Sequence, residues 1–468
     1  MREVVDRILQ RALDGGATFA DLRLIRGTGT TVVVQDGRAD KVATRRSHGA
    51  GIRVLVDGAW GFAPTNNPTA EGLEECVQDA LAMARVAAPH VTDPGVVAEA
   101  PAVEATVRRV PRIDPRDVSL DDRIAAACEL EQVARLRDER VVNTVLQYGD
   151  GAGEMVVANT LGTYLTTSGV GCSLSLAVTA ADGSERQHSS KSRAGRQGFE
   201  IVEELDAEEF AGKTADRAVS LLSAEPAPSG KFDVVIDPLI CGLLVHEAFG
   251  HNAEADAIWT GNSILAGKLG QPVASELVTI TDDPTRPNLN GSFEYDHEGV
   301  RAERHVIVEE GVLQGYLHSL ETAARLGMRP NGAARAQGHQ DVPIVRMSNT
   351  AIEPGDWSVD EMLAETRQGL YLVGGAWGYV YTAAGQFTCN VEEAFLIDNG
   401  SLATHFRNVC IAGMTLETLS NVWAVGNDLR FELGGVCGKD GQAAAVDSGG
   451  PHVAIRGVVV GGQQALVR

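Results

Sequence analysis

The amino-acid sequence lacks long apolar runs, paired cysteines and an excess of positive charge, and each absence excludes a class of protein. No apolar run reaches the roughly 18 residues that a membrane-spanning helix needs, so we expect no membrane segment. The seven cysteines are an odd number without a CxxC pair, which argues against a disulfide framework and suits a reducing compartment. The segment after Met1 carries acidic residues and no apolar stretch, so no signal peptide is predicted. These absences together predict a cytoplasmic protein.

Negative charge dominates the composition. Asp and Glu number 63 against 40 Lys and Arg, which gives a formal net charge of -23 and a pI near 4.9. This balance argues against nucleic acid or an anionic membrane surface as the main partner. Hydrophobic residues make up 44% of the chain and charged residues 22%, as in ordinary globular proteins. At 468 residues the chain is long enough for two domains, each with its own core.

The first half of the sequence alternates between helical and strand patterns. Apolar periodicity predicts helices over 4–12, 70–88, 119–137 and 206–223. Runs of apolar and β-branched residues predict strands over 20–26, 30–35, 51–56, 141–147, 153–159 and 171–180. Asp-Gly pairs at 36–37 and 57–58 are typical of turns between antiparallel strands. We therefore predict a mixed α+β fold, with helices packed on a mostly antiparallel sheet.

A segment rich in turn-forming residues divides the chain at 224–231. It combines prolines, a serine and a glycine between a helical run and an apolar run. We expect an N-terminal domain of residues 1–223 before this linker and a C-terminal domain of residues 232–468 after it.

The second half is predicted to be rich in β-structure. It opens with a strand over 232–236 and a helix over about 239–254. Further helices are predicted over 319–326 and 358–368, and short strands over 278–281, 304–309, 312–316, 393–399, 402–405 and 453–460. Gly, Asn and Asp turns separate these strands, which favours a sandwich or barrel-like domain that carries the first helix.

That first helix contains the motif His246-Glu247-Ala248-Phe249-Gly250-His251. Imidazoles are good zinc ligands, and a glutamate beside them can act as a general base. The two histidines are five residues apart, which places them about 140° apart on a regular helix, too far for one metal ion. The helix would have to widen through a π-type turn or end early, and Gly250 is where such a distortion costs least. A hydrogen-bonded core network of the same side chains is the competing interpretation.

A zinc site needs a third protein ligand, and the residues leave three possibilities open. Glu254 and Asp256 follow the motif closely, and either carboxylate would complete a compact site. Cys437 lies 186 residues after His251, in the glycine-rich stretch 434–439, where a flexible backbone can approach a distant site.

Taken together, these motifs make the chain resemble the TldD/PmbA family of metallopeptidases, also called modulators of DNA gyrase. The resemblance covers most of the chain and lies in residues 51–63, 246–256, 274–279, 426–429, 436–442 and 460–462. It implies that His246, His251 and Cys437 hold Zn²⁺ and that Glu247 is the catalytic base. PmbA-type (TldE) subunits lack the histidine motif, so this chain is similar to the catalytic TldD-type subunit.

The resemblance also implies an activity and an assembly. We expect a peptidase that hydrolyses unstructured peptides in a cavity between two subunits, where the peptide pairs like a strand. The second subunit would be a TldE/PmbA-like partner or a second copy, and the task would be leader-peptide removal or the trimming of small unfolded proteins. The alternatives are a non-catalytic regulatory subunit and a metal-dependent amide hydrolase for a peptide-like metabolite.

The substrate-contacting residues depart from the family pattern. Residues 252–256 and 330–335 differ from the usual family sequences, and residues 374–381 are unusually aromatic. We expect Trp377 of this aromatic stretch to contact substrate. Arg335, His339 and Arg346 are candidates for contacting substrate and stabilising the oxyanion.

Overall fold

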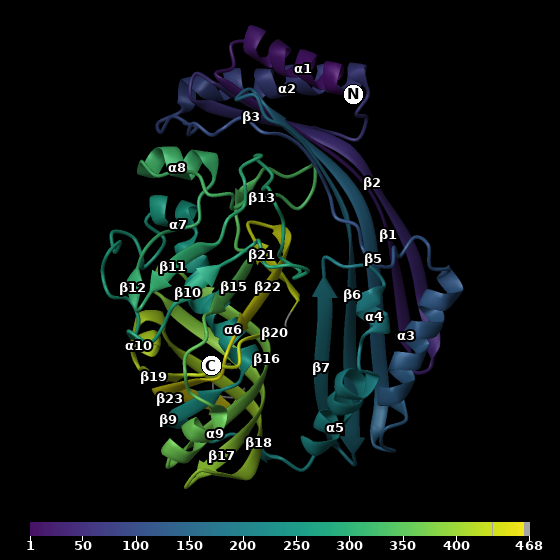
Figure 1. The fold of residues 1–468 in the computed structure, drawn as a ribbon, viewed down its shortest axis with the longest axis vertical. Helices are drawn as coiled ribbons and strands as arrows, with labels where there is room; N and C mark the ends of the chain where they lie inside the picture. Colours follow the sequence, from purple (N-terminus) through teal and green to yellow (C-terminus); the bar gives the residue numbers. More distant parts are fainter. Residues whose placement is uncertain (433, 463–468) are drawn as a thin grey trace.

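The computed structural model describes residues 1–432 and 434–462. In the first half, one large sheet runs along the molecule and helices cover its two ends (Figure 1). The helices are α1 (Arg2–Asp14), α2 (Ala70–Ala87), α3 (Leu120–Arg135), α4 (Glu200–Glu203) and α5 (Lys213–Ser220). The strands are β1 (Phe19–Gln35), β2 (Arg38–Val56), β3 (Ala59–Thr65), β4 (Glu104–Arg108), β5 (Val141–Asn159), β6 (Tyr164–Asp182) and β7 (Glu185–Gly195). Their order is β3-β2-β1-β5-β6-β4 with β7 also paired to β6, and all pairs except β4–β6 are antiparallel.

The predicted division of two of these strands is wrong. β1 and β5 run unbroken for 17 and 19 residues, through the gaps 27–29 and 148–152 that we left between shorter strands. Gly29 of β1 lies opposite Gly151 of β5, and a Cβ atom added at Gly29 would come 2.8 Å from the carbonyl oxygen of Asp150. These glycines therefore mark a crowded row inside the sheet and not a loop, because a close cross-strand approach favours glycine as much as a turn does.

Two separate hydrophobic cores lie at the ends of this long sheet. At one end α1 and α2 bury Ile8 and Leu73 against β1 and β2. At the other end α3 and α5 pack on Leu146 and Leu176 of β5 and β6. Each such aliphatic side chain stabilises the fold by about 1.5–3 kcal/mol when fully buried. The sheet also contacts the second half of the chain, where Arg23 of β1 donates to the carbonyl of Gly338 and Arg53 of β2 lies 2.7 Å from Glu298.

The second half contains a closed barrel. The barrel strands are β9 (Gly230–Ile236), β16 (Gln368–Tyr381), β17 (Gln386–Asp398), β18 (Ser401–Met414) and β23 (Val453–Gly462). They follow the order β23-β9-β16-β17-β18, and β18 pairs back to β23. β8 (Glu225–Pro226), inside the predicted linker, pairs with β18, and β19 (Val422–Val425) pairs with β23.

A second sheet packs beside the barrel. Its strands are β10 (Ile280–Asp282), β11 (His305–Glu309), β12 (Val312–Leu313), β15 (Asn349–Ile352), β20 (Arg430–Phe431), β21 (Gly435–Lys439) and β22 (Gln442–Gly450). A small pair, β13 (Ala334–Arg335) and β14 (Ile344–Val345), stands apart. The helices are α6 (Pro238–Leu244), α7 (Ala255–Trp259), α8 (Leu320–Leu326), α9 (Val359–Glu365) and α10 (Thr415–Ser420). α6 lies between the barrel and this sheet and contacts both β16 and β22.

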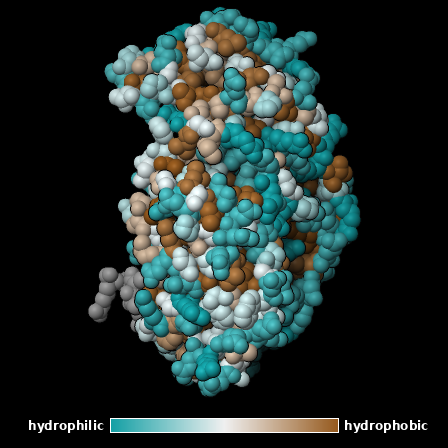
Figure 2. All heavy atoms as spheres, turned by 60° about the vertical axis from the view of Figure 1, so that its left-hand side comes forward, coloured by the Kyte–Doolittle hydropathy of each residue, from teal (hydrophilic) through white to brown (hydrophobic). Residues whose placement is uncertain are grey.

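The predicted fold class is confirmed, although the bounds of several elements differ from the prediction. The first half is α+β on an antiparallel sheet, and the second is β-rich with a barrel that adjoins α6. The predicted helix over 358–368 ends at Glu365, and the unpredicted strand β16 begins three residues later, at Gln368. No helix of the described residues is long and apolar enough to cross a membrane. Figure 2 shows a mostly hydrophilic face on which hydrophobic residues are scattered in small groups.

Candidate metal centre

The helix that carries the histidine motif changes geometry where the motif begins. Asp237 caps α6 by accepting a hydrogen bond from the Ile240 backbone N–H (2.9 Å), and its other oxygen accepts one from Gly374 of β16 (2.9 Å). After α6 the chain continues as a π-helix over Val245–Gly250 and then as a short 3₁₀ turn. The widening that the five-residue spacing predicts is therefore confirmed, although the single predicted helix over 239–254 is three segments.

The π-helix brings the two histidines onto one face. The backbone N–H of His251 donates to the carbonyl of His246, which is the i→i+5 bond of a π turn. The two rings lie 5.2 Å apart between centroids, at 81° to each other. The carbonyl of Ala248, which the wide turn leaves available, accepts hydrogen bonds from Asn252 Nδ2 (3.0 Å) and Thr415 Oγ1 (2.9 Å). The carbonyl group that the π turn leaves available is thus hydrogen-bonded by two side chains.

Gly250 contributes through its missing side chain and not through backbone freedom. Its φ of -57° and ψ of -48° are ordinary helical values. A Cβ atom added there would lie 1.9 Å from the sulfur of the fully buried Met347.

We expect Gly250→Ala to lower the free energy of unfolding by about 1–3 kcal/mol, as overpacking of a core does. Urea denaturation would measure this. Gly435→Ala is the matched control, because an added Cβ there meets no atom within 4 Å. Equal stability of the two variants would contradict this account of Gly250.

Cys437 reaches the histidines from the hairpin of β21 and β22. Its Sγ atom lies 3.3 Å from Nε2 of His251, and one ligand atom each of His246, His251 and Cys437 fall within 4.8 Å of one another. Both His246 and Cys437 are only 5% exposed. Among the described residues no other group of three potential ligand side chains comes this close together.

The chemistry of these three donors fits a zinc ion. Burial alone would raise the pKa of the Cys437 thiol, but hydrogen bonds with His246 and His251 outweigh it and bring that pKa to about 5. The sulfur is therefore a thiolate, the form that binds metals. Zinc–ligand bonds of about 2.0–2.3 Å in a tetrahedron put ligand atoms roughly 3.5 Å apart. The distance of 3.3 Å between Cys437 Sγ and His251 Nε2 is close to this value. Nδ1 of His246 is buried without a hydrogen-bond partner among the described residues.

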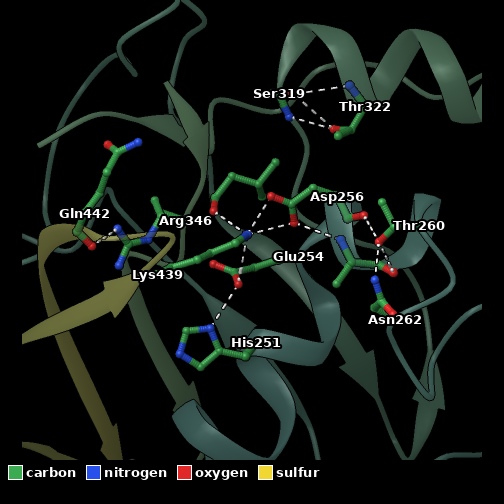
Figure 3. A network of polar contacts seen from close by, with 12 residues as sticks. His251, Glu254, Asp256, Thr260, Asn262, Ser319, Thr322, Arg346, Lys439 and Gln442 are labelled. Atoms are coloured by element: carbon green, nitrogen blue, oxygen red, sulfur yellow. Dashed lines mark hydrogen bonds and ion pairs between the residues drawn. The ribbon is translucent and has the colours of Figure 1, made fainter. Parts of the chain in front are cut away.

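Figure 3 shows Glu254 next to the His251 ring, and Asp256 beyond Glu254. Glu254 Oε2 contacts His251 Nδ1 at 2.9 Å, which leaves Nε2 facing Cys437. Burial would raise the pKa of Glu254, but the charges of Lys439 and His251 hold it near 2. Asp256 instead accepts hydrogen bonds from Lys439 Nζ at 2.6 and 2.7 Å. Of the three possible third ligands, the geometry therefore favours Cys437 and makes Glu254 an orienting partner.

Sequence reasoning gave Lys439 no role, yet it connects the two parts of the site. Its ammonium, on a side chain that is 15% exposed, lies 3.2 Å from Glu254 Oε2 and donates to the carbonyl of Val345 at 3.0 Å. The same hairpin is held by Arg346, which donates to the carbonyl of Cys437 at 2.5 Å and that of Gln442 at 3.1 Å. The only available signal was the position of Lys439, two residues after Cys437.

We expect Lys439→Met to weaken binding of a metal ion by about 10–100-fold, the usual cost of losing an outer partner of a ligand. Without the ammonium, the buried Glu254 and the partly exposed Asp256 would lose the cation that pairs with both, and Glu254 would no longer be held ionised beside His251. Competition with a chelator would measure the affinity. Lys191→Met is the control, since among the described residues Lys191 pairs with Glu209 alone, at 3.8 Å. An unchanged affinity in Lys439→Met would contradict the orienting role.

The three donors open into a pocket of about 1130 Å³. Glu247 lines it beside the histidines, and a Cβ atom added at Gly378 of β16 would lie 2.7 Å from Glu247 Cγ. Trp377 also lines the pocket and is 57% exposed. The opposite wall includes residues 190–192 of β7, so both halves of the chain build the pocket, a feature that sequence reasoning missed.

The other predicted substrate contacts lie outside this lining. Arg335 is buried and donates to the carbonyls of Met347 and Ala445, and Arg346 is committed to the Cys437 hairpin. His339 contacts Asn66 at 2.7 Å between its Nε2 and the amide oxygen. We infer that both arginines support the fold, because both terminal nitrogens of each guanidinium group donate to backbone carbonyls.

Three segments of the chain match known domains. Residues 20–84 match the PmbA/TldA metallopeptidase domain 1, residues 113–222 the central domain and residues 229–462 the C-terminal domain. A protein named Metalloprotease from Methanothermobacter thermautotrophicus is 43% identical over 444 residues, 95% of each chain. A Zinc metalloprotease TldD homolog from Saccharolobus solfataricus is 26% identical over 97% of this chain and 99% of that protein. The crystal structure of TldE from Thermococcus kodakarensis shares the fold, with a TM-score of 0.81 and 19% identity over 98% of this chain and 100% of that one.

Proposed function

The chain belongs to the PmbA/TldD family and is a metallopeptidase, and from this premise we propose that it is a zinc enzyme that hydrolyses unstructured peptides in the pocket beside Glu247. The observation that carries the proposal is the convergence of two imidazoles and a thiolate beside a carboxylate in one pocket of about 1130 Å³. The Saccharolobus relative is named a zinc metalloprotease, which supports the choice of metal.

His246, His251 and Cys437 would hold the zinc ion. When bound, zinc supplies Lewis-acid chemistry, polarising a peptide carbonyl and making a water molecule more acidic. Glu254 fixes the His251 ring through Nδ1, and Lys439 keeps Glu254 ionised.

Glu247 would act as the general base. It lines the pocket next to His246 and is not paired with a cation among the described residues, so its carboxylate can accept a proton. It would take a proton from the attacking water and return it to the leaving nitrogen as the peptide bond breaks.

The open edge of β16 would hold the peptide. β16 pairs with β9 only through Leu370–Leu372, so residues 375–381 have no strand partner on the side away from β17 among the described residues. The pocket is lined by consecutive residues from Gly374 to Val380, hence by both faces of the strand, while β17 contributes only Glu392. An extended peptide can add to such an edge by backbone hydrogen bonding, which a folded protein cannot do.

The assembly and the biological task follow from the family resemblance. We include in the proposal a dimer, formed with a TldE/PmbA-like subunit or with a second copy, that encloses the pocket. Leader-peptide removal and the trimming of small unfolded proteins are the tasks that suit an enclosed site. Light scattering of the protein alone and after co-expression with such a subunit would separate the two assemblies.

Metal analysis and peptide digestion test the function together. We expect about one zinc ion per chain and cleavage of disordered peptides, detected by mass spectrometry, with folded proteins left intact. A chelator should stop cleavage and added zinc should restore it. Zinc-loaded protein that cleaves no peptide but hydrolyses small amides would favour the amide hydrolase, and protein that binds no zinc would contradict the proposal.

A further inference from the structure

Three exposed aromatic side chains follow one another on β16 beside the pocket. Trp377, Tyr379 and Tyr381 alternate along the strand, so all three point to the same face. Their exposed fractions are 57%, 61% and 58%. Exposed apolar groups that gather in this way mark binding sites, whereas single ones are ordinary.

The backbone of β16 is distorted directly before this row. Gly374 has a φ of +78°, and the register with β17 shifts between Gly375 and Trp377, which leaves Ala376 as a bulge. A β-bulge re-aims the side chains that follow it and is common beside active sites. The bulge therefore sets where the aromatic row begins.

The row and the general base lie on opposite faces of one strand. Gly378 lies between Trp377 and Tyr379 in the strand, so it faces the other side. A Cβ atom added at Gly378 would lie 2.7 Å from Cγ of Glu247. Trp377 and Tyr379 line the same pocket as Glu247, whereas Tyr381 does not. A strand laid along this edge would thus show alternate side chains to the aromatic pair and to the catalytic side.

We propose that Trp377 and Tyr379 form a subsite for bulky apolar side chains at alternate positions of the substrate. This deepens the proposed peptidase function and rests on it. Side chains of neighbouring strands on one face interact directly, and pairs of aromatic with aromatic or β-branched residues are among the favourable ones. The substrate class is an unstructured segment whose every second residue is large and apolar.

The charge of the pocket narrows this class further. Acidic residues outnumber basic ones in the lining, and Glu247, Glu432 and Asp440 belong to it. Acidic side chains are disfavoured near such a surface, because like charges repel. The subsite should therefore select apolar residues and reject aspartate and glutamate.

Peptide binding to the Glu247→Gln variant tests the subsite without cleavage. One disordered peptide carries phenylalanine at three alternate positions, and a second carries serine there. We expect the first to bind about 10-fold more tightly, by fluorescence anisotropy. Trp377→Thr and Tyr379→Thr, which keep a β-forming residue, should each weaken the first peptide and leave the second unchanged. Tyr381→Thr, an equally exposed aromatic outside the pocket, should have less than a twofold effect.

Several results would overturn the subsite. These are equal affinity for the two peptides, equal losses for both peptides in the variants, or tighter binding when the phenylalanines are replaced by lysine. A loss of dimer mass in Trp377→Thr would assign the row to a subunit contact instead. Cleavage of either peptide by the wild-type enzyme is measured separately, so a peptidase without this preference is distinguished from a protein that is not a peptidase.

Discussion

Replacement of Glu247 by glutamine should lower peptide cleavage by about 100- to 10,000-fold, the usual contribution of a general base. Glutamine keeps the shape of the side chain but cannot take a proton from water. The packing against Gly378 is preserved, so the pocket should keep its form. The rate of cleavage of a disordered peptide, followed under single-turnover conditions, measures the effect, and metal content should stay at the wild-type level.

Glu432→Gln is the matched control for this variant. Glu432 lines the same pocket, and Arg430 lies 3.7 Å away, so its loss changes the local charge by the same amount. We expect it to retain activity within about threefold, because a partly exposed ion pair contributes little. Unchanged cleavage in Glu247→Gln would remove this residue from the base role, and equal losses in both variants would point to pocket charge as the cause.

The histidine motif shows how far local sequence could predict this site. Five-residue spacing is incompatible with a regular helix that serves one metal, so the pattern itself required a wider turn. The structure contains that turn, closed by a bond from the His251 N–H to the His246 carbonyl. The choice among Glu254, Asp256 and Cys437 could not be made by spacing. It depends on how the β21–β22 hairpin places Cys437 beside His251, a contact between residues 186 positions apart in the chain.

Contacts between distant segments also explain which residue roles could not be predicted from the sequence. Lys439 became visible as an orienting cation only when Glu254 and Asp256 were placed around it. Arg335 and Arg346 were candidates for contacting substrate because a developing oxyanion needs a positively charged donor. In the structure both side chains are buried, and their terminal nitrogens donate to backbone carbonyls. Long-range pairing, not residue type, decided these roles.

The long strands illustrate a second limit. Gaps containing glycine between apolar runs favour turns in most sequences, and we divided β1 and β5 on that basis. In this sheet a glycine on one strand faces a glycine on the next, so the residues that suggest a break allow the strands to pass through. The helices α2 and α3 were predicted to within two residues at each end, because 3.6-residue periodicity and caps such as Thr69 and Ser119 are local signals.

Replacement of Cys437 by serine should weaken zinc binding by about 100-fold or more. Sites with four protein ligands bind zinc with roughly 10–16 kcal/mol, so one ligand accounts for about 3 kcal/mol. Serine is nearly isosteric, but its hydroxyl is not ionised at neutral pH and is a poor ligand for zinc. Because Cys437 is one of only three donors within 4.8 Å, no other described side chain can replace it without movement of the chain. Competition titration with a chelator measures the affinity.

Cys410 provides the matched control for the Cys437→Ser variant. Like Cys437 it is a buried, unpaired cysteine on a strand, only 2% exposed, but it contacts Thr388 and none of the three donors. Cys410→Ser should keep zinc affinity within about threefold, since the loss of a ligand and not of a buried thiol is the cause. Full zinc affinity in Cys437→Ser would exclude the thiolate. Glu254 would then be the next ligand to test, because its Oε1 atom is buried without a hydrogen-bond partner among the described residues.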